Sequence, residues 1–511
     1  MKKLKYFKIF IASGLVVMST SCSKDFLEVD PYGKQSADGY FQSADNANLA
    51  TYAAYDMLSS DQFAGAGGSG WASNMFTRVL CSDETNCGGG GSGDQSQYQA
   101  IDKFDWQPNN SGFKAYYSKG YYGIARCNTV ISNVTIPTLV AEAKFLRAYY
   151  LFELTQAFGD VPMPLDNAPN LSTGNPKVKQ AQVYAQIIKD LTEAIVDLPN
   201  KKVNAGSADA FRANKQAAQA LLGKTYLYMG DNAKAAAAFD AVIATEGTQV
   251  GLEPVFSSVT KMSTEFGMES LFEANFASDK RNWGNATWDR TANDNRHIQL
   301  AGPRQLDAID KTKKMDSPVL AGWGFFPPTK KLFNDIDPAD PRKINTLMDS
   351  VQLAVYNTDF VDGWDTEGLI RTKYTTFADQ TDGTNGNVAE LNYGTNWRLI
   401  RYADVLLMAA EATYKTDEAY ALTQINKVRK RAGFASDTTA TGAGLFNLIV
   451  KEREVELAYE GHRFFDLVRW GLAEKELGSL GYKSFNAHFP IPTDELNANV
   501  ALSPADQNPG Y

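Results

Sequence analysis

The sequence is poor in the residues that most enzymes use. It has three histidines and four cysteines among 511 residues, and His297, His462 and His488 lie far from one another and from metal-ligand spacing. Neither a G-x-S-x-G nucleophile elbow nor a P-loop occurs. Glycines at 88–91 and 93 match G-x-G-x-x-G only formally, because they follow no predicted strand and open no predicted helix. We therefore expect no enzyme, no cofactor and no metal site.

An excess of positive charge is also missing. The net charge is −9, and it falls by four, to −13, if Lys2, Lys3, Lys5 and Lys8 leave with an amino-terminal signal peptide. Nucleic acid is disfavoured as a partner, since it requires a basic surface.

No apolar run is long enough to cross a bilayer. The run at 9–18 has ten residues and follows a basic start, which is typical of a signal peptide and predicts one over residues 1–21. Cys22 comes directly after Ser-Thr-Ser and resembles the acylated cysteine of a bacterial lipoprotein box. We expect Cys22 to be lipidated and to anchor the protein in a membrane, with residues 22–43 as a tether. The alternative is plain secretion with Cys22 discarded.

The other three cysteines are expected to have structural roles. Cys81 and Cys87 could close a small disulfide loop in an oxidising compartment. Cys127 stands among apolar residues and is expected to be a buried small side chain.

Residues 211–245 have the pattern of a tetratricopeptide helical hairpin. Small residues such as Gly223 alternate with Leu222, Tyr226 and Phe239 at helical spacing, and a Gly-Asp-Asn turn separates the two halves. One hairpin cannot bury its apolar face alone, so neighbours of the same kind are expected. Helical period indeed marks residues 44–58, 113–134, 138–158, 180–198, 397–414, 419–432 and 443–471.

The predicted fold class is therefore mostly α, with about four helix pairs bracketing one large irregular insert. We expect a helical-repeat region at 44–246, a loop-rich, ligand-binding region at 247–396, and a carboxy-terminal helical region at 397–511. The last helix carries a stripe of Glu452, Glu456 and Glu460, which we interpret, together with Glu454, as a solvated or salt-bridged face. Its expected partners are Arg453, Arg463 and Arg469.

Several segments resemble the SusD/RagB-like outer-membrane nutrient-binding lipoproteins of Bacteroidetes. They are SCSKDFLEVD at 21–30, AEAKFLRAYYLFELTQAFGDVP at 141–162, WRLIRYADVLLMAAEA at 397–412, EREVELAYEGHRFFDLVRWG at 452–471, HFPIPTDEL at 488–496 and QNPGY at 507–511. The resemblance implies a SusD-like helical fold, a cell-surface location on the outer membrane, and a SusC-like TonB-dependent transporter as partner.

A glycan site needs flat aromatic rings for the sugar faces and Asn, Asp or Arg for the hydroxyl rims. Two loop regions supply this mixture, and their candidate ligand-binding residues are Asp83, Tyr98, Trp106 and Asn109 in the first, and Trp283, Trp288 and Arg290 in the second. Trp323, between two glycines, is a further candidate. By resemblance to the starch-binding member of the family, Asp83 and residues 106–110 lie where that protein contacts its ligand. Trp397 and Trp470 sit in predicted amphipathic helices and are expected in the core.

The favoured function is capture of an oligosaccharide or polysaccharide and its delivery to the transporter. Peptide capture remains an alternative, because the family also has peptide-importing members and a backbone-binding groove would serve them. A helical scaffold that binds no ligand and a surface glycosidase are further alternatives.

Overall fold

The computed structural model describes residues 37–59, 74–167, 172–203, 209–278, 280–283, 295–384 and 386–511. Cys22, Trp288 and Arg290 lie outside these residues. Within them, no helix combines the length and apolar character that a bilayer crossing requires.

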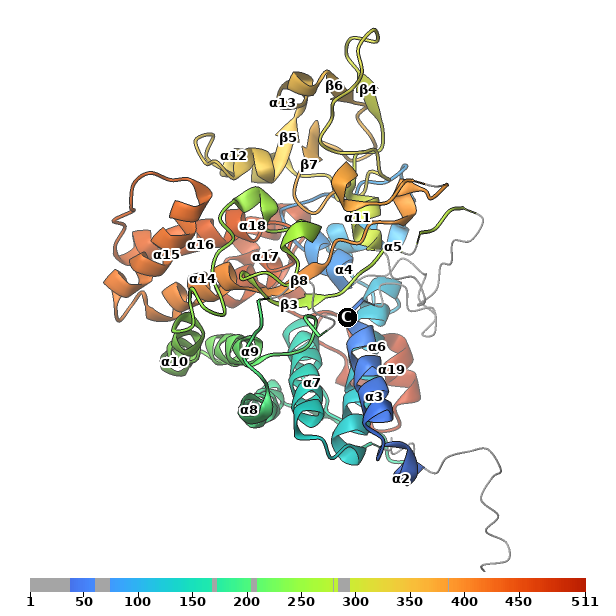
Figure 1. Cartoon of the computed structure of the whole chain (residues 1–511). Coiled ribbons are helices and arrows are strands. Elements are labelled where there is room, and N and C mark those ends of the chain that lie inside the picture. Colours follow the sequence, from blue (N-terminus) through green and yellow to red (C-terminus); the bar gives the residue numbers. More distant parts are fainter. Residues whose placement is uncertain are drawn as a thin grey trace, which may run out of the picture.

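The amino-terminal half is helical, as predicted (Figure 1). Its main helices are α3 (Ala44–Ser59), α6 (Ser111–Asn133), α7 (Pro137–Phe158), α8 (Gln180–Asp197), α9 (Lys215–Tyr228) and α10 (Asn232–Ile243). Each packs on the next, and α10 also packs on α14 (Tyr402–Thr413) of the carboxy-terminal region. Shorter elements complete this half: α2 (Ala37–Tyr40), α4 (Asn74–Leu80), α5 (Ser96–Asp102), β1 (Val161–Pro162) and β2 (Lys177–Val178).

The hairpin at α9 and α10 follows the predicted packing. Gly223 leaves room for the ring of Phe239, which lies 2.5 Å from the point where a Cβ on Gly223 would stand. Asp231 caps α10 by accepting a hydrogen bond from the backbone N–H of Lys234. Any side chain at 223 would therefore force the two helices apart.

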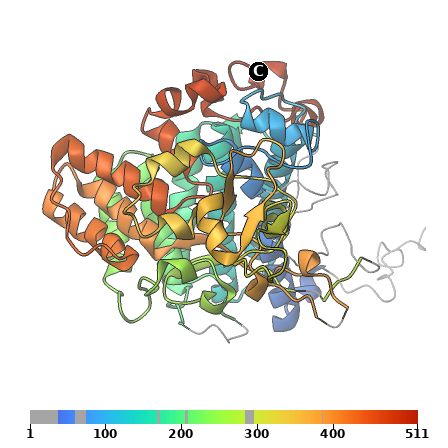
Figure 2. The same ribbon diagram turned by 90° about the horizontal axis from the view of Figure 1, so that it is seen from above.

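The middle region consists of short elements, as its composition predicts. It contains β3 (Ser270–Ala274), α11 (Arg296–Ala301), β4 (Leu306–Ala308), α12 (Lys330–Asp335), β5 (Leu347–Asp349), α13 (Ser350–Leu353), β6 (Thr358–Phe360) and β7 (Leu369–Arg371). The pairs β4–β6 and β5–β7 are antiparallel. Of these, β4–β7, α12 and α13, drawn in yellow to light orange, gather on one side of the helical frame, at the top in Figure 1 and towards the viewer in Figure 2, whereas β3 lies lower, among the helices.

Two helix boundaries differ from the prediction in the carboxy-terminal region. Residues 397–401 form strand β8 (Trp397–Arg401), which pairs antiparallel with β3, so the helix begins only at Tyr402. Trp397 is buried as expected, but on a strand. The predicted helix 443–471 is in fact α16 (Gly442–Glu456) and α17 (Arg463–Arg469), because Tyr459 and Gly461 adopt positive φ and interrupt the helix.

The remaining elements of this region are α15 (Glu418–Ala432), α18 (Ala473–Leu477) and α19 (Thr493–Ala498). Cys81, Cys87 and Cys127 are free and buried. The Cys81–Cys87 disulfide is therefore absent, and Cys127 packs in the core as predicted.

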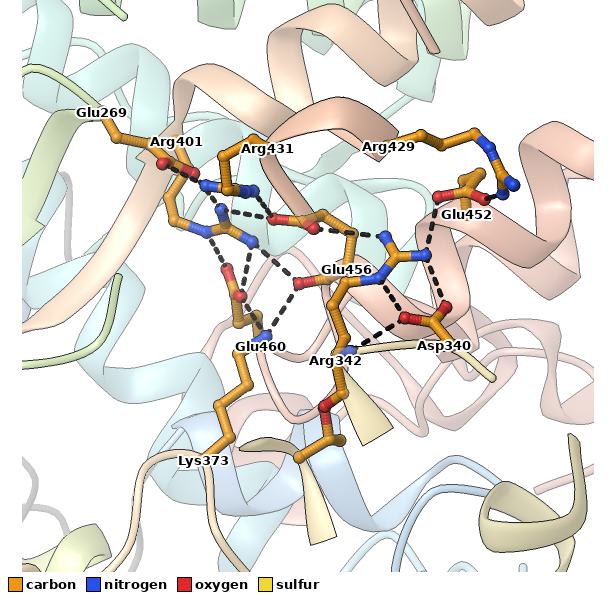
Figure 3. Close-up of polar contacts among 11 residues, drawn as sticks. Glu269, Asp340, Arg342, Lys373, Arg401, Arg429, Arg431, Glu452, Glu456 and Glu460 are labelled. Atoms are coloured by element: carbon orange, nitrogen blue, oxygen red, sulfur yellow. Dashed lines mark hydrogen bonds and ion pairs between the residues drawn. The ribbon is translucent and has the colours of Figure 1, made fainter. Parts of the chain in front are cut away.

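One predicted ion pair is confirmed, since Arg463 lies 3.0 Å from Glu454. The stripe of Glu452, Glu456 and Glu460 is salt-bridged but buried, and its partners differ from the three predicted arginines (Figure 3). Glu460 accepts hydrogen bonds from Arg401 and Lys373, at 2.8 and 2.7 Å, and Glu452 lies 2.9 Å from Arg342. The charges of the network balance, with five basic and five acidic residues: Arg342, Lys373, Arg401, Arg429, Arg431, Glu269, Asp340, Glu452, Glu456 and Glu460. Because Arg342 and Lys373 come from the middle region, the network attaches that region to the carboxy-terminal helices.

Candidate functional site

One pocket brings together two of the predicted ligand-binding residues, Tyr98 and Trp323. Its volume is about 430 Å³, within the range of small-molecule sites. The apolar lining consists of Tyr98, Leu300, Phe325 and Phe326, and the remaining side chains that line it are Asp94, Gln95, Arg304 and Trp323. Tyr98 comes from α5 and Leu300 from α11, two helices that lie close together in Figure 1.

The aromatic lining is supported from behind by Phe76 of α4. Its ring meets Tyr98 edge-on at 5.6 Å and lies 4.7 Å from Phe326, measured between centroids. Tyr98 is only 1% exposed, so its ring is held by packing before any ligand arrives. Trp323 is half-buried and presents the larger accessible aromatic surface.

Backbone pairing fixes the position of Trp323. Its N–H donates to the carbonyl of Gln299 at 3.2 Å, and the N–H of Gly324 donates to Gly302 at 2.8 Å. On the other side, Gly89 donates to the carbonyl of Gly324 at 2.8 Å. Trp323 therefore stands on a segment that is hydrogen-bonded to the end of α11 on one side and to the glycine-rich loop on the other. This backbone pairing was not predicted from the sequence.

The glycine-rich loop brings a carboxylate and a guanidinium to the same place. A Cβ on Gly90 would stand 3.1 Å from Asp94 Oδ2 and 3.1 Å from Arg304 Nη2. The N–H of Gly90 donates to Asp94 Oδ2 at 2.8 Å, and Arg304 Nη1 donates to the carbonyl of Trp323 at 3.2 Å. Both polar groups are thereby oriented beside the aromatic ring.

The second predicted region approaches this pocket through one segment. Trp323 Nε1 donates a long hydrogen bond, 3.5 Å, to Glu390 Oε2. Two residues away, the N–H of Val388 donates to the carbonyl of Arg281 at 2.9 Å. Trp283 follows two residues after Arg281 and is 55% exposed, so its indole lies on the surface; it does not line the Trp323 pocket.

Asp83 does not face a ligand. It is 3% exposed and accepts hydrogen bonds from Arg463 Nε and Nη2, while Lys331 Nζ lies 2.8 Å from its other side. Burial would raise the pKa of Asp83, but the hydrogen bonds and charge of Arg463, together with Lys331, lower it to about 2. This carboxylate is a structural anion.

Trp106 is likewise a core residue. It is 3% exposed, packs among Phe104, Phe113 and Phe489, and donates its indole N–H to the carbonyl of Ile101 at 2.9 Å. Asn109 is exposed in the turn before α6 and does not line the pocket. The sequence alone could not separate these cases, because a tryptophan before a turn suits either role.

Three pocket-lining residues were not predicted from the sequence: Asp94, Gln95 and Arg304. Two signals could have indicated them: Asp94 and Gln95 end the glycine run, and Arg304 follows Gly-Pro at the end of a short helix. Such positions place polar side chains on exposed loops.

A second cavity of about 420 Å³ lies near α3 and is lined by Tyr52, Glu142 and Arg212. Arg212 is engaged there by Glu142, at 3.0 Å, and by Asn48 and the Tyr52 hydroxyl. Tyr52 is the one aromatic residue among its described lining residues, and the guanidinium of Arg212 covers the ring at 4.9 Å from the centroid. The Trp323 pocket, with several aromatic residues, is therefore the stronger candidate. Among the residues that the structure describes, no group of three His, Cys, Asp or Glu side chains could hold a metal.

Comparisons with known proteins agree with this architecture. Residues 354–511 match the SusD family, and residues 25–227 match the family described as "Starch-binding associating with outer membrane". A solved "Laminarin binding SusD-like protein" is 31% identical with a TM-score of 0.80, covering 92% of this chain and 100% of its own. Surface glycan-binding protein A from Bacteroides fluxus is 26% identical with a TM-score of 0.77 and the same coverage. SusD-like protein P2 of Formosa agariphila is 27% identical over the full length of both chains.

Proposed function

This chain belongs to the SusD family, and we propose that it is a cell-surface lipoprotein that captures glycan at the Trp323 pocket. The observation that carries the proposal is the convergence of Tyr98, Trp323, Asp94 and Arg304 in one pocket. Stacking on a flat ring suits the apolar face of a sugar, while a carboxylate and a guanidinium suit its hydroxyls.

The captured ligand is delivered to a SusC-like TonB-dependent transporter in the same outer membrane. Acylated Cys22 and the tether 22–43 hold the protein there, since acyl chains add about 0.8 kcal/mol of binding per buried CH₂. The helical regions 44–246 and 397–511 form the frame, and 247–396 carries most of the ligand-binding surface. Residues 94–98, from the helical region 44–246, form one wall of the Trp323 pocket.

The protein binds without chemistry. Glycoside hydrolysis requires two carboxyl groups that flank the scissile bond. Of the described side chains that line the pocket, Asp94 is the one carboxylate. The nearby Glu390 accepts a hydrogen bond from the Trp323 indole, which suits a role in holding the ring.

Laminarin is the first polysaccharide to test, because a SusD-like relative at 31% identity is described as binding it. The experiment measures binding of residues 23–511 to laminarin and a polysaccharide panel by native-gel retardation and calorimetry. Retardation by laminarin, abolished in Trp323→Ala and retained in Trp364→Ala, is the expected result. Trp364 is a matched loop tryptophan that does not line the pocket. Retention of peptides with no glycan retardation would overturn the proposal in favour of peptide import.

A further inference from the structure

The charged side chains of the Trp323 pocket carry information about the ligand beyond its being a glycan. Asp94 and Arg304 are the two charged residues among the described side chains that line it. Asp94 Oδ2 and Arg304 Nη2 each lie 3.1 Å from the position of a Cβ added to Gly90, so the two atoms are at most 6.2 Å apart. Glu390 adds a second carboxylate behind the Trp323 indole. These three described side chains carry two negative charges and one positive charge.

A sugar hydroxyl suits the space between Asp94 and Arg304. A hydroxyl has one donor hydrogen and two acceptor lone pairs. It can donate to the Asp94 carboxylate and accept from the Arg304 guanidinium at the same time. Both bonds involve a charged partner, which makes them stronger than neutral ones.

A sulfate or carboxylate group on the sugar does not suit the space between Asp94 and Arg304. Such a group only accepts hydrogen bonds, so it could pair with Arg304 but would place its charge against Asp94. Like charges brought together at a binding surface oppose association and so discriminate between partners. Arg304 is also turned towards the carbonyl of Trp323, to which it donates at 3.2 Å, and this contact occupies part of its donor capacity.

We propose that Asp94 and Arg304, both beside Gly90, restrict the pocket to uncharged sugar units and exclude sulfated or uronic-acid units. The inference rests on the proposed glycan-binding function and deepens it by naming the class of ligand. Asp94 acts as the selective group because it accepts from a hydroxyl and repels an anion.

The test compares two probes with one backbone, laminarin and chemically sulfated laminarin, by calorimetry with residues 23–511 at low ionic strength, where charge effects are least screened. Wild-type protein should bind laminarin about tenfold or more tightly than the sulfated form. Asp94→Asn, which removes the charge but keeps the shape of the side chain, should lower the ratio of laminarin affinity to sulfated-laminarin affinity several-fold.

The control is Asp437→Asn, which changes the net charge equally but lies in the loop after α15, beside Lys430 at 3.1 Å. This variant should keep the wild-type ratio. Equal binding of both probes by the wild type, or the same effect from both substitutions, would overturn the inference while leaving glycan capture intact. Failure of both probes and of every other polysaccharide to bind would overturn the proposed function as well.

Discussion

Arg463 holds Asp83 through two parallel hydrogen bonds, from Nε to Oδ1 and from Nη2 to Oδ2, each 2.9 Å long. The pair joins the loop after α4 to the start of α17, and both side chains are buried. Asp83→Asn should lower the free energy of unfolding by about 3 kcal/mol, the lower end for a broken buried pair, because the buried guanidinium keeps Glu454, at 3.0 Å, as its remaining counter-charge. Urea denaturation monitored by fluorescence measures this loss.

A matched control is Asp335→Asn. Asp335 pairs with the same Lys331 at 2.7 Å but is half-exposed, so its removal should cost less than about 1 kcal/mol. If Asp83→Asn instead weakens glycan binding while stability is unchanged, Asp83 is a ligand contact after all.

Trp106→Ala should destabilise the protein by about 3–5 kcal/mol, as expected for a large aromatic removed from a core. Its ring packs against Phe104 at 5.1 Å and Phe489 at 5.1 Å, so the truncation leaves a cavity between two regions of the chain. Thermal and urea denaturation report the change, and calorimetry of the folded protein should give wild-type laminarin affinity. If the variant is as stable as the wild type but has lost its affinity for laminarin, Trp106 is a ligand-binding residue.

Stability should fall steeply in acid because of the buried ion network. Burial would raise the pKa of Glu456, but Arg431, Arg401 and Arg342 lower it to about 2. A carboxylate with a folded-state pKa below its unfolded value, about 4.3, stabilises the protein above that unfolded value. This contribution is lost as the pH falls from about 4 towards 2.

The measurement is the urea midpoint between pH 7 and pH 3. Glu456→Gln should be less stable at pH 7 and should lose less stability on acidification than the wild type. Asp231→Asn, at an exposed pair with Lys234, should keep the wild-type pH dependence. Parallel curves for Glu456→Gln and the wild type would contradict the role assigned to this glutamate.

The helical frame could be predicted because local pattern and tertiary packing agree there. At α9 and α10, Gly223 and Phe239 interlock as their spacing indicates. At residues 397–401 the two disagree: the apolar pattern suits a helix, but the backbone pairs with β3, 123–131 residues earlier in the chain. Such a partner is not encoded locally, so the strand was missed.

The binding site could be predicted only in part, because its residues also depend on partners that are distant in the sequence. Tyr98 and Trp323 lie 225 positions apart and meet only because the glycine-rich loop pairs with the segment that carries Trp323. Residue type identified them as candidates. The same criterion selected Asp83 and Trp106, whose burial depends on Arg463 and Phe489 from the other end of the chain. Loop tryptophans and acids are ambiguous until these distant partners are known.

Trp283→Ala should leave stability within about 0.5 kcal/mol of the wild type, since its side chain is largely exposed. Its segment is hydrogen-bonded through Arg281 to Val388, two residues before the Glu390 that contacts Trp323, so we expect an outer contact for chains longer than the pocket. Calorimetry should show weaker binding of laminarin but little change for a short laminarin fragment. Equal losses for both ligands would place Trp283 within the pocket itself.

Gly90→Ala should weaken laminarin binding about tenfold or more, a loss of about 1.4 kcal/mol. The new methyl group would stand 3.1 Å from both Asp94 Oδ2 and Arg304 Nη2, so both side chains would have to shift from the positions in which a ligand hydroxyl could bridge them. Gly91→Ala is the matched control, because no atom lies within 4 Å of its added Cβ, and it should bind as the wild type does. Circular dichroism and thermal denaturation should show that both variants fold normally. If Gly90→Ala retains full affinity, the ligand does not occupy the space between Asp94 and Arg304, and recognition must depend on the aromatic surface of Trp323 instead.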